Sequence, residues 1–352
     1  MRKRVFVVVL LVLLVLIAVA GLSGAWIVFG PNTSEQADDR GVKIPPGSSF
    51  ENVVTSLAED GIIQSATTLR WFGRATGWGG QIKAGYYTID PGSSNYDILS
   101  KLRRGLQSPV RITIPPGTRP EVIATLAGNV MYFDADEMLS ALKDSTLAAE
   151  LGVDTTSLFG YMLPESYDFY WLTSAEGVIR RIKQYADELF AREIAEGARE
   201  MNLSMHEVVT LASIVEWETH VAEERPRVAG VYLNRLRIGM PLQADPTVQY
   251  AVMANEGAKR RLLFVDYEIE SPYNTYRIGG LPPGPITNPS AASLRAVANA
   301  ERHDYLYFVA TGDGGHIFSR TFQEHVNAAN RYRRLMQERR RAQQQSPDSN
   351  AE

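Results

Sequence analysis

The chain has 352 residues, with 40 acidic and 36 basic side chains and a formal net charge of −4 at pH 7. This slightly acidic balance gives no electrostatic basis for binding nucleic acid. The sequence contains no cysteine, which excludes a disulfide framework, a thiol nucleophile and a zinc–thiolate site. The length is sufficient for two globular domains.

The N-terminal segment predicts a transmembrane anchor. Residues 1–4 include three basic side chains, and residues 5–30 form an apolar run without a charge. About 20 apolar residues span the hydrocarbon core of a bilayer, and basic residues before the span favour a cytoplasmic N-terminus with the remainder outside the cytoplasm. We therefore expect a single-pass protein of the inner (plasma) membrane whose catalytic domain is extracytoplasmic, or periplasmic.

A cleaved signal peptide is the alternative for this segment. Residues 18–20, Ala-Val-Ala, resemble the small-residue site at which signal peptides are cleaved. The apolar run continues past them to Phe29, which favours the anchor.

Three segments after the anchor share one local pattern: a short strand, a Pro-Gly turn, a Ser or Thr, and a helix. They begin at Val42, Tyr87 and Arg111. Proline and glycine favour the chain reversal, and a hydroxyl side chain after it can accept hydrogen bonds from the first free amides of a helix. The expected N-caps are Ser48 or Ser49, Ser93 or Ser94, and Thr118, with Pro120 in the first helical turn.

The first two of these segments predict a small α+β domain at residues 41–108, after a polar, turn-rich linker at 31–40. The order of elements resembles a LysM-like module, a small fold that holds glycans containing N-acetylglucosamine. A structural module that only positions the next domain is the alternative. The expected elements are a first strand, helices at 50–60 and 66–76, a strand at 84–89 and a helix at 96–104.

A helix further along the chain carries two glutamates, Glu216 and Glu218. Ser204 and Glu207 predict a capping box at its start. Pro226 is expected either to break the helix or to lie in the first turn of a new one. At about 100° per residue, Glu218 lies in the middle of an apolar stripe and Glu216 lies roughly 200° away from it. The stripe consists of Leu211, Ile214, Val215 and Ala222.

Glu218 is therefore a candidate general acid. Burial on an apolar face raises the pKa of a carboxyl group, and a protonated carboxyl can donate its proton to a leaving oxygen near neutral pH. The structural alternative is a glutamate paired with Arg225, two turns further along the same face. Glu216 is expected to be a helix-surface group, or a group that supports the acid without touching the substrate.

Two segments after this helix offer groups that suit sugar binding. One leads into another helix, and the other is a loop rich in Gly and Pro at residues 271–290. Aromatic rings stack on the apolar faces of pyranoses, and amides hydrogen-bond to sugar hydroxyls. Packing is the alternative for each ring taken singly. The candidate substrate-binding residues are Gln243, Asp245, Tyr273, Asn274 and Tyr276.

Four long blocks follow one another in the second half of the chain: LASIVEWET (211–219), NRLRIGMPLQADPTVQY (234–250), YNTYRIGGLPPGPITNPS (273–290) and YLYFVATGDGGHIFS (305–319). They resemble the signature blocks of the endolytic murein transglycosylases, the YceG-like family. An upstream block, GYMLPESYDFYW, departs from the Phe-Pro-Asp-Thr-Tyr usual in that family at Leu163, Glu165 and Ser166.

The resemblance covers most of the chain and implies an α+β fold with three parts. These are one transmembrane helix at 5–30, the small LysM-like α+β domain at 41–108 and a larger α+β catalytic domain at 109–338. A basic helical end running into a polar tail is expected at residues 339–352.

The resemblance also implies a reaction. The enzyme would be a lytic transglycosylase, a carbon–oxygen lyase that cleaves the β-1,4 bond from N-acetylmuramic acid (MurNAc) to N-acetylglucosamine (GlcNAc) in nascent peptidoglycan strands. The product would carry a 1,6-anhydroMurNAc end, made without water. The catalytic glutamate of the family falls on Glu218, which would be the single general acid and base. Asp245, which precedes Pro246 in a turn, is expected to cap a helix rather than act as a nucleophile.

Two other functions stay open. A muramidase would hydrolyse the same bond with a water activated opposite Glu218, and a non-catalytic, membrane-tethered scaffold would bind peptidoglycan without cleaving it. The five histidines include no i, i+4 pair, which disfavours a metal site, and we expect no cofactor. The expected partners are peptidoglycan strands, the inner membrane and, from the resemblance, the cell-wall synthesis machinery, but not nucleic acid.

Overall fold

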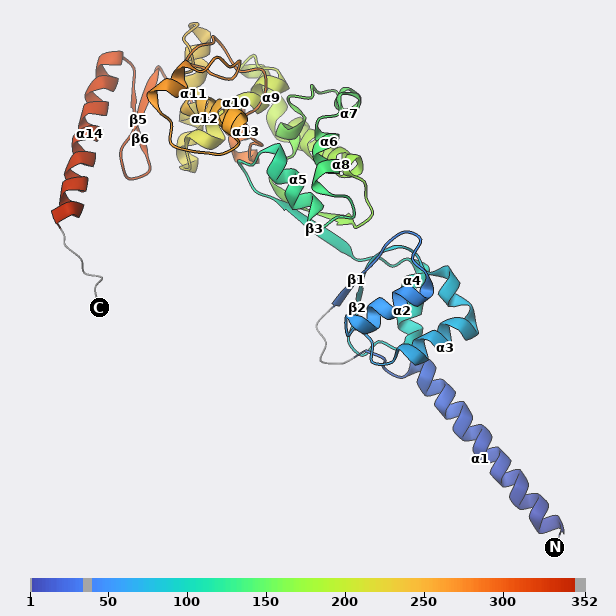
Figure 1. Cartoon of the computed structure of the whole chain (residues 1–352). Helices are drawn as coiled ribbons and strands as arrows, with labels where there is room; N and C mark the ends of the chain where they lie inside the picture. Colours follow the sequence, from blue (N-terminus) through green and yellow to red (C-terminus); the bar gives the residue numbers. More distant parts are fainter. Residues whose placement is uncertain (1, 34–39, 346–352) are drawn as a thin grey trace. The chain divides into compact units, whose positions relative to one another are not determined.

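The computed structural model describes residues 2–33 and 40–345 (Figure 1). Most of the expected linker at 31–40, and residues 346–352 of the expected tail, lie outside the described residues. The chain divides into two compact units, one formed by Met1–Arg111 with Asp168–Thr173 and the other by Ile112–Tyr167 with Ser174–Glu352. Both helices and strands are present, so the fold is mixed, as expected.

The N-terminal helix α1 (Arg2–Phe29) contains the expected apolar run. Its segment Arg4–Phe29 has a mean hydropathy of 3.5 over its most apolar window, and none of that window is buried. Among the described residues, α1 is the one helix long and apolar enough to span a membrane. The helix runs without a break through residues 18–20, the candidate cleavage site. These properties are consistent with a single-pass anchor.

The rest of the first unit has the expected order of strand, helix, helix, strand and helix. Its two strands pair antiparallel, with Val42 opposite Tyr87. Ser49 and Ser94, in each case the second of the two candidates, cap the helices that follow them. The elements are β1 (Arg40–Ile44), α2 (Phe50–Glu59), α3 (Ala66–Thr76), η1 (Trp78–Gln81), β2 (Gly85–Ile89) and α4 (Asn95–Arg104).

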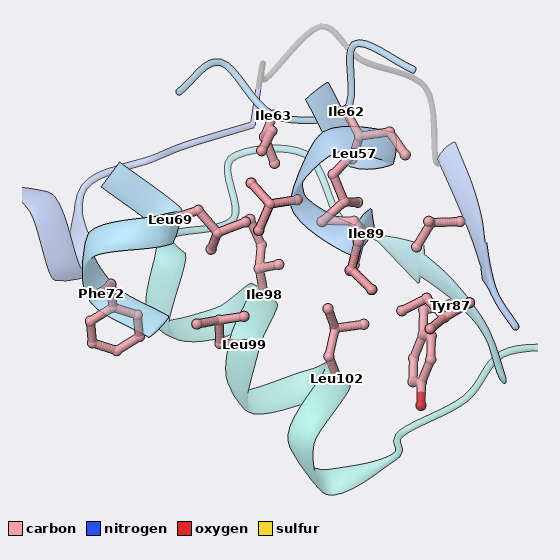
Figure 2. Packing of buried hydrophobic residues seen from close by; sticks show 14 residues of the cluster. Leu57, Ile62, Ile63, Leu69, Phe72, Tyr87, Ile89, Ile98, Leu99 and Leu102 are labelled. Carbon is pink, nitrogen blue, oxygen red and sulfur yellow. The ribbon is translucent and has the colours of Figure 1, made fainter. Parts of the chain in front are cut away.

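Apolar side chains from both strands and from α2, α3 and α4 form the core of the first unit (Figure 2). Leu57, Leu69 and Leu102, one from each helix, are fully buried within it, and Tyr87 and Ile89 extend it to the sheet. Burial of one such leucine contributes about 1.5–3 kcal/mol. This core fixes the position of α4 in the unit.

The second unit is mainly helical. Its helices are α5 (Pro120–Gly128), α6 (Ala135–Leu142), α7 (Ser145–Glu150), η2 (Leu158–Tyr161), α8 (Ala175–Leu189), η3 (Phe190–Ile194), α9 (Ala195–Glu200), α10 (Met205–Glu218), η4 (Ala222–Glu224), α11 (Arg225–Arg237), α12 (Asp245–Glu256), η5 (Phe264–Glu268), α13 (Ala291–Ala298) and α14 (Phe322–Gln345). Strands β5 (Tyr307–Ala310) and β6 (His316–Ser319) form an antiparallel hairpin before α14. Strands β3 (Pro109–Ile114) and β4 (Glu165–Tyr170) form a third two-stranded sheet, and each of the two strands has residues in both units.

The helix after the third repeated turn, α5, does not begin with the predicted N-cap. Pro120 is the first residue of α5, as expected, but the N-cap is Arg119 rather than Thr118. The hydroxyl of Thr118 donates to the carbonyl oxygen of Pro115 at 2.8 Å, so it closes the Pro-Gly turn instead of the helix.

Candidate active site

Helix α10 presents Glu218 at its C-terminal end. Ser204 and Glu207 form the expected capping box at its start. The prediction that the helix continues to Pro226 is wrong, because Thr219 is extended and ends α10 directly after Glu218. The chain then makes the short turn η4 and enters α11 at Arg225. Pro226 lies in the first turn of α11, which was one of its two expected positions.

The predicted division of α10 into an apolar and a polar face is also wrong. Every residue from 208 to 216 is buried, because α10 packs against α11, α12 and α13 (Figure 1). Glu216 is 6% exposed, whereas Glu218 is partly exposed. A surface position for Glu216 is therefore excluded.

Glu216 joins three helices. It pairs with Arg225 of α11, whose Nη2 lies 3.3 Å from Oε1. Its Oε2 accepts a hydrogen bond from the backbone amide of Ser290, the N-cap of α13, at 2.9 Å. Arg225 therefore pairs with Glu216, and the structural alternative of an Arg225–Glu218 pair is not realised.

The carboxyl group of Glu218 has a different environment. Its Oε2 accepts a hydrogen bond from the hydroxyl of Tyr232 on α11 at 3.0 Å. Burial raises the pKa of Glu218 to about 7; the negative charge of Asp245 adds to this rise, whereas the Tyr232 hydrogen bond and the positive charge of Arg235 oppose it. Desolvation is the larger effect, as expected for a carboxyl without a direct cationic partner.

The side chain of Glu218 lines a pocket with a volume of about 250 Å³. The pocket brings together side chains from α10, α11 and α12, from the 271–290 loop, and from the hairpin and α14. Its lining residues are Glu218, Arg235, Gln243, Asp245, Tyr276, Tyr307, Phe308, Phe322 and His325.

Three of the five predicted substrate-binding residues line this pocket: Gln243, Asp245 and Tyr276. Gln243 has a φ of +49°, a left-handed conformation that is uncommon outside glycine. Its backbone N–H donates a hydrogen bond to the carbonyl oxygen of Thr275 at 3.1 Å. The prediction of Asp245 as a helix cap is wrong. Ala244 is the N-cap of α12, and Oδ1 of Asp245 accepts a hydrogen bond from the hydroxyl of Tyr276 at 2.7 Å.

The other two predicted residues lie outside the pocket lining. Asn274 is fully buried, and its side-chain amide donates to the carbonyl oxygens of Tyr267 at 3.0 Å and Ile269 at 2.9 Å. The ring of Tyr273 packs on that of Tyr250, with 4.6 Å between centroids. Both side chains therefore shape the loop.

Two parts of the pocket were not predicted from the sequence: Arg235, and an aromatic wall formed by Tyr307, Phe308, Phe322 and His325. The Nε of buried Arg235 donates to the carbonyl oxygen of Leu306 at 2.7 Å, and its guanidinium lies 5.4 Å from the ring centroid of Tyr307. His325 of α14 stacks on the same ring at 5.3 Å. Arg235 could have been noticed in the sequence as an arginine inside the apolar pattern of α11. The aromatic wall could not, because it depends on how the β5–β6 hairpin and α14 pack.

The profile of the YceG-like family matches residues 42–331. An endolytic murein transglycosylase of Bacillus subtilis is 31% identical, over 83% of this chain and 84% of that protein. A protein of the same name from Streptococcus pneumoniae is 28% identical, over 92% of this chain and 66% of that protein. The crystal structure of a YceG-like protein from Listeria monocytogenes has a TM-score of 0.57 and 30% identity, covering 82% of this chain and 98% of that one. The chain belongs to the YceG-like family.

Proposed function

We propose that this protein is an endolytic lytic transglycosylase of peptidoglycan, with Glu218 as its single general acid and base. Family membership and the relatives named endolytic murein transglycosylase support this enzyme class. The observation that carries the role of Glu218 is its pKa of about 7 on a carboxyl that lines the pocket. Such a carboxyl is protonated in a large share of molecules at neutral pH and can act as an acid.

In the first step, the bond between C1 of MurNAc and the glycosidic oxygen breaks. The proton of Glu218 moves to that oxygen, the bonding electron pair leaves with it, and the GlcNAc side departs with a free hydroxyl. Positive charge develops at C1 and the ring oxygen. Asp245, held by Tyr276 at 2.7 Å, is proposed to stabilise this charge as a carboxylate.

In the second step, Glu218 acts as the base. Its carboxylate takes the proton of the C6 hydroxyl of the same MurNAc while O6 forms a bond to C1. The 1,6-anhydro ring is closed, Glu218 is protonated again, and no water is consumed. Tyr232, whose hydroxyl is 3.0 Å from Oε2, is proposed to orient the carboxyl group and to stabilise the carboxylate between the two steps.

We propose that Gln243 and Tyr276 hydrogen-bond to the saccharide and that Tyr307 and Phe322 supply apolar surfaces for pyranose rings. All four line the pocket with Glu218. Tyr273 and Asn274 are proposed to act only by shaping the 271–290 loop, because they lie outside the pocket lining and pack within the protein.

The test of Glu218 is turnover of peptidoglycan strands by Glu218→Gln beside Glu223→Gln. Glu223 is exposed in η4 and lies outside the pocket lining, so its substitution is the matched control. We expect loss of turnover only in the first variant, with glycan binding retained. Full activity of Glu218→Gln would reject the proposal and favour the scaffold function.

A muramidase is the second candidate, because Asp245 is a second carboxylate in the same pocket. Retaining and inverting hydrolases both use a pair of carboxyl groups. Cleavage in ¹⁸O-labelled water distinguishes the two reactions. Label incorporated at the new MurNAc end would establish hydrolysis, whereas the transglycosylase leaves that end unlabelled.

We further propose that the first unit is a LysM-like glycan-holding module on the extracytoplasmic side of the membrane. The order of β1, α2, α3 and β2 and the anchor-like α1 support this. Hydrogen exchange with a chitooligosaccharide tests it. Slower exchange of amides in residues 42–104 is expected, and protection confined to the second unit would leave the structural-module alternative.

A further inference from the structure

Residues 27–33 connect α1 directly to the rest of the first unit. Asn95, in the first turn of α4, donates from Nδ2 to the carbonyl oxygen of Ile27 at 2.7 Å. That carbonyl belongs to the last turn of α1, where backbone acceptors have no partner within the helix. The side chain of Asn95 therefore caps the C-terminal end of the membrane-spanning helix.

Asn32 completes this junction. Its Nδ2 donates to Oδ1 of Asn95 at 2.7 Å, and its Oδ1 accepts from the amide of Ser65 at 2.7 Å. Its backbone amide donates to the carbonyl oxygen of Ser93 at 2.8 Å, and its carbonyl accepts from the amide of Gln64 at 2.7 Å. Asn32 and Asn95 are only 4% and 1% exposed. Residues 31–33, expected to begin a linker, are instead part of the fold.

Buried amides of this kind are unfavourable when they lose their partners. The end of α1 and the rest of the first unit therefore move as one body. Only Gly30 and Pro31 separate Phe29, the end of the apolar span, from the buried Asn32, so the unit cannot lie far from the bilayer surface.

Aromatic side chains surround the junction. Trp26 and Phe29 are exposed on α1. The ring of Phe29 lies 5.6 Å from that of Tyr96, which is in the first turn of α4 and 41% exposed. Tryptophan and tyrosine are enriched where a bilayer meets water, since their rings prefer the headgroup region. The apolar surface of α1 thus continues directly onto Tyr96.

We infer that the first unit is seated on the phospholipid surface, with Tyr96 in the headgroup region. The exposed rings of Phe29 and Tyr96 continue the apolar surface of the membrane-spanning helix, so the partner that we expect to cover them is the lipid interface. The other end of α4 is about 15 Å away for a ten-residue helix. Exposed Leu106 follows that end and on this placement lies further from the lipid than Tyr96. This placement is independent of the reaction proposed for the second unit.

The absence of cysteine makes site-specific labelling direct. The full chain is reconstituted in vesicles of phosphatidylethanolamine and phosphatidylglycerol that contain a lipid with a headgroup-region nitroxide. Single variants Tyr96→Cys and Leu106→Cys carry an environment-sensitive fluorophore. Leu106 is 46% exposed, so the two positions are matched in exposure. A label at Trp26→Cys, inside the span, verifies insertion.

We expect the nitroxide lipid to remove most of the fluorescence at position 96 and little at position 106. Little quenching at both positions would overturn the inference, because the unit would then be held away from the lipid. Equal, strong quenching at both positions would also overturn it, because the lipid would then contact Leu106 as closely as Tyr96.

Asn95→Asp tests the junction itself. It keeps the Oδ acceptor that Asn32 uses and removes the donor to the carbonyl of Ile27. With the label at 106, we expect faster rotational motion of the unit than in the matched control Asn52→Ala, an exposed position on α2. Unchanged motion would contradict the rigid junction. If Asn95→Asp fails to fold, the quenching at position 96 in the otherwise native chain still decides the placement.

Discussion

The hydrogen bond from the hydroxyl of Tyr232 is one of the influences on the pKa of Glu218, and removing that hydroxyl tests its effect. The hydroxyl donates to Oε2 of Glu218 at 3.0 Å and lowers the pKa of that carboxyl against the larger, opposite effect of burial. Tyr232→Phe removes the hydroxyl but keeps the ring that packs edge-on against Phe308. We therefore expect the pKa of Glu218 to rise above its present value of about 7.

The size of the rise follows from the hydrogen bond that is lost. A hydrogen bond to a charged group contributes about 1.5–3 kcal/mol, and one pKa unit corresponds to about 1.4 kcal/mol, so the expected rise is about one to two units. In the proposed mechanism the protonated form of Glu218 starts the reaction, so activity should fall as pH increases through this pKa. The alkaline limb of the profile should therefore move to higher pH.

The assay is kcat/KM for peptidoglycan strands as a function of pH, with products separated by chromatography. Tyr170→Phe is the control, since Tyr170 is exposed on β4 and belongs to the first unit. An alkaline limb that stays in place, or moves to lower pH, in Tyr232→Phe would refute the assignment of this limb to Glu218.

The remaining predictions concern the pocket and the helix junction. Asp245→Asn removes a charge that raises the pKa of Glu218, so the alkaline limb should move to lower pH. Turnover should fall but persist, because the carboxylate proposed to stabilise the charge at C1 is lost while the acid and base remains; abolished turnover would instead favour the hydrolase. Glu216→Ala leaves the guanidinium of Arg225 buried without its partner, so the free energy of unfolding measured in urea should fall by about 3–5 kcal/mol, and a loss under about 1 kcal/mol would contradict this. Phe322→Ala removes a ring that is 65% exposed in the pocket wall. Calorimetry with Glu218→Gln protein should then show glycan affinity lowered about 2- to 10-fold at unchanged stability, and equal affinity would exclude the ring from the glycan site.

Local signals in the sequence were sufficient to predict where many of the helices and strands begin and end. Helix α3 has the predicted bounds, because Ser65 caps its start and Gly77, in the left-handed conformation, ends it. The capping box of Ser204 and Glu207 was readable for the same reason, since both partners lie within one turn. Such signals depend on neighbours in the chain and need no tertiary structure.

The contacts that define the site were not readable in this way. Glu216 binds Ser290, 74 positions away, and Asp245 binds Tyr276, 31 positions away. The helical wheel assumed one face in water, whereas the second unit covers α10 on all sides. The premise of the helical wheel therefore fails, although the resemblance to the family pointed to Glu218 independently. Glu218 differs from Glu216 in lining the pocket and in forming no ion pair with an arginine among the described residues.

The central claim is that cleavage closes an anhydro ring with Glu218 as the acid and base. Mass spectrometry of strands digested by the protein, beside its Glu218→Gln variant, tests this most directly. We predict MurNAc ends lighter by one water than reducing ends, produced by the parent protein and absent with the variant. Reducing ends in the parent digest, or anhydro ends made by the variant, would contradict the account.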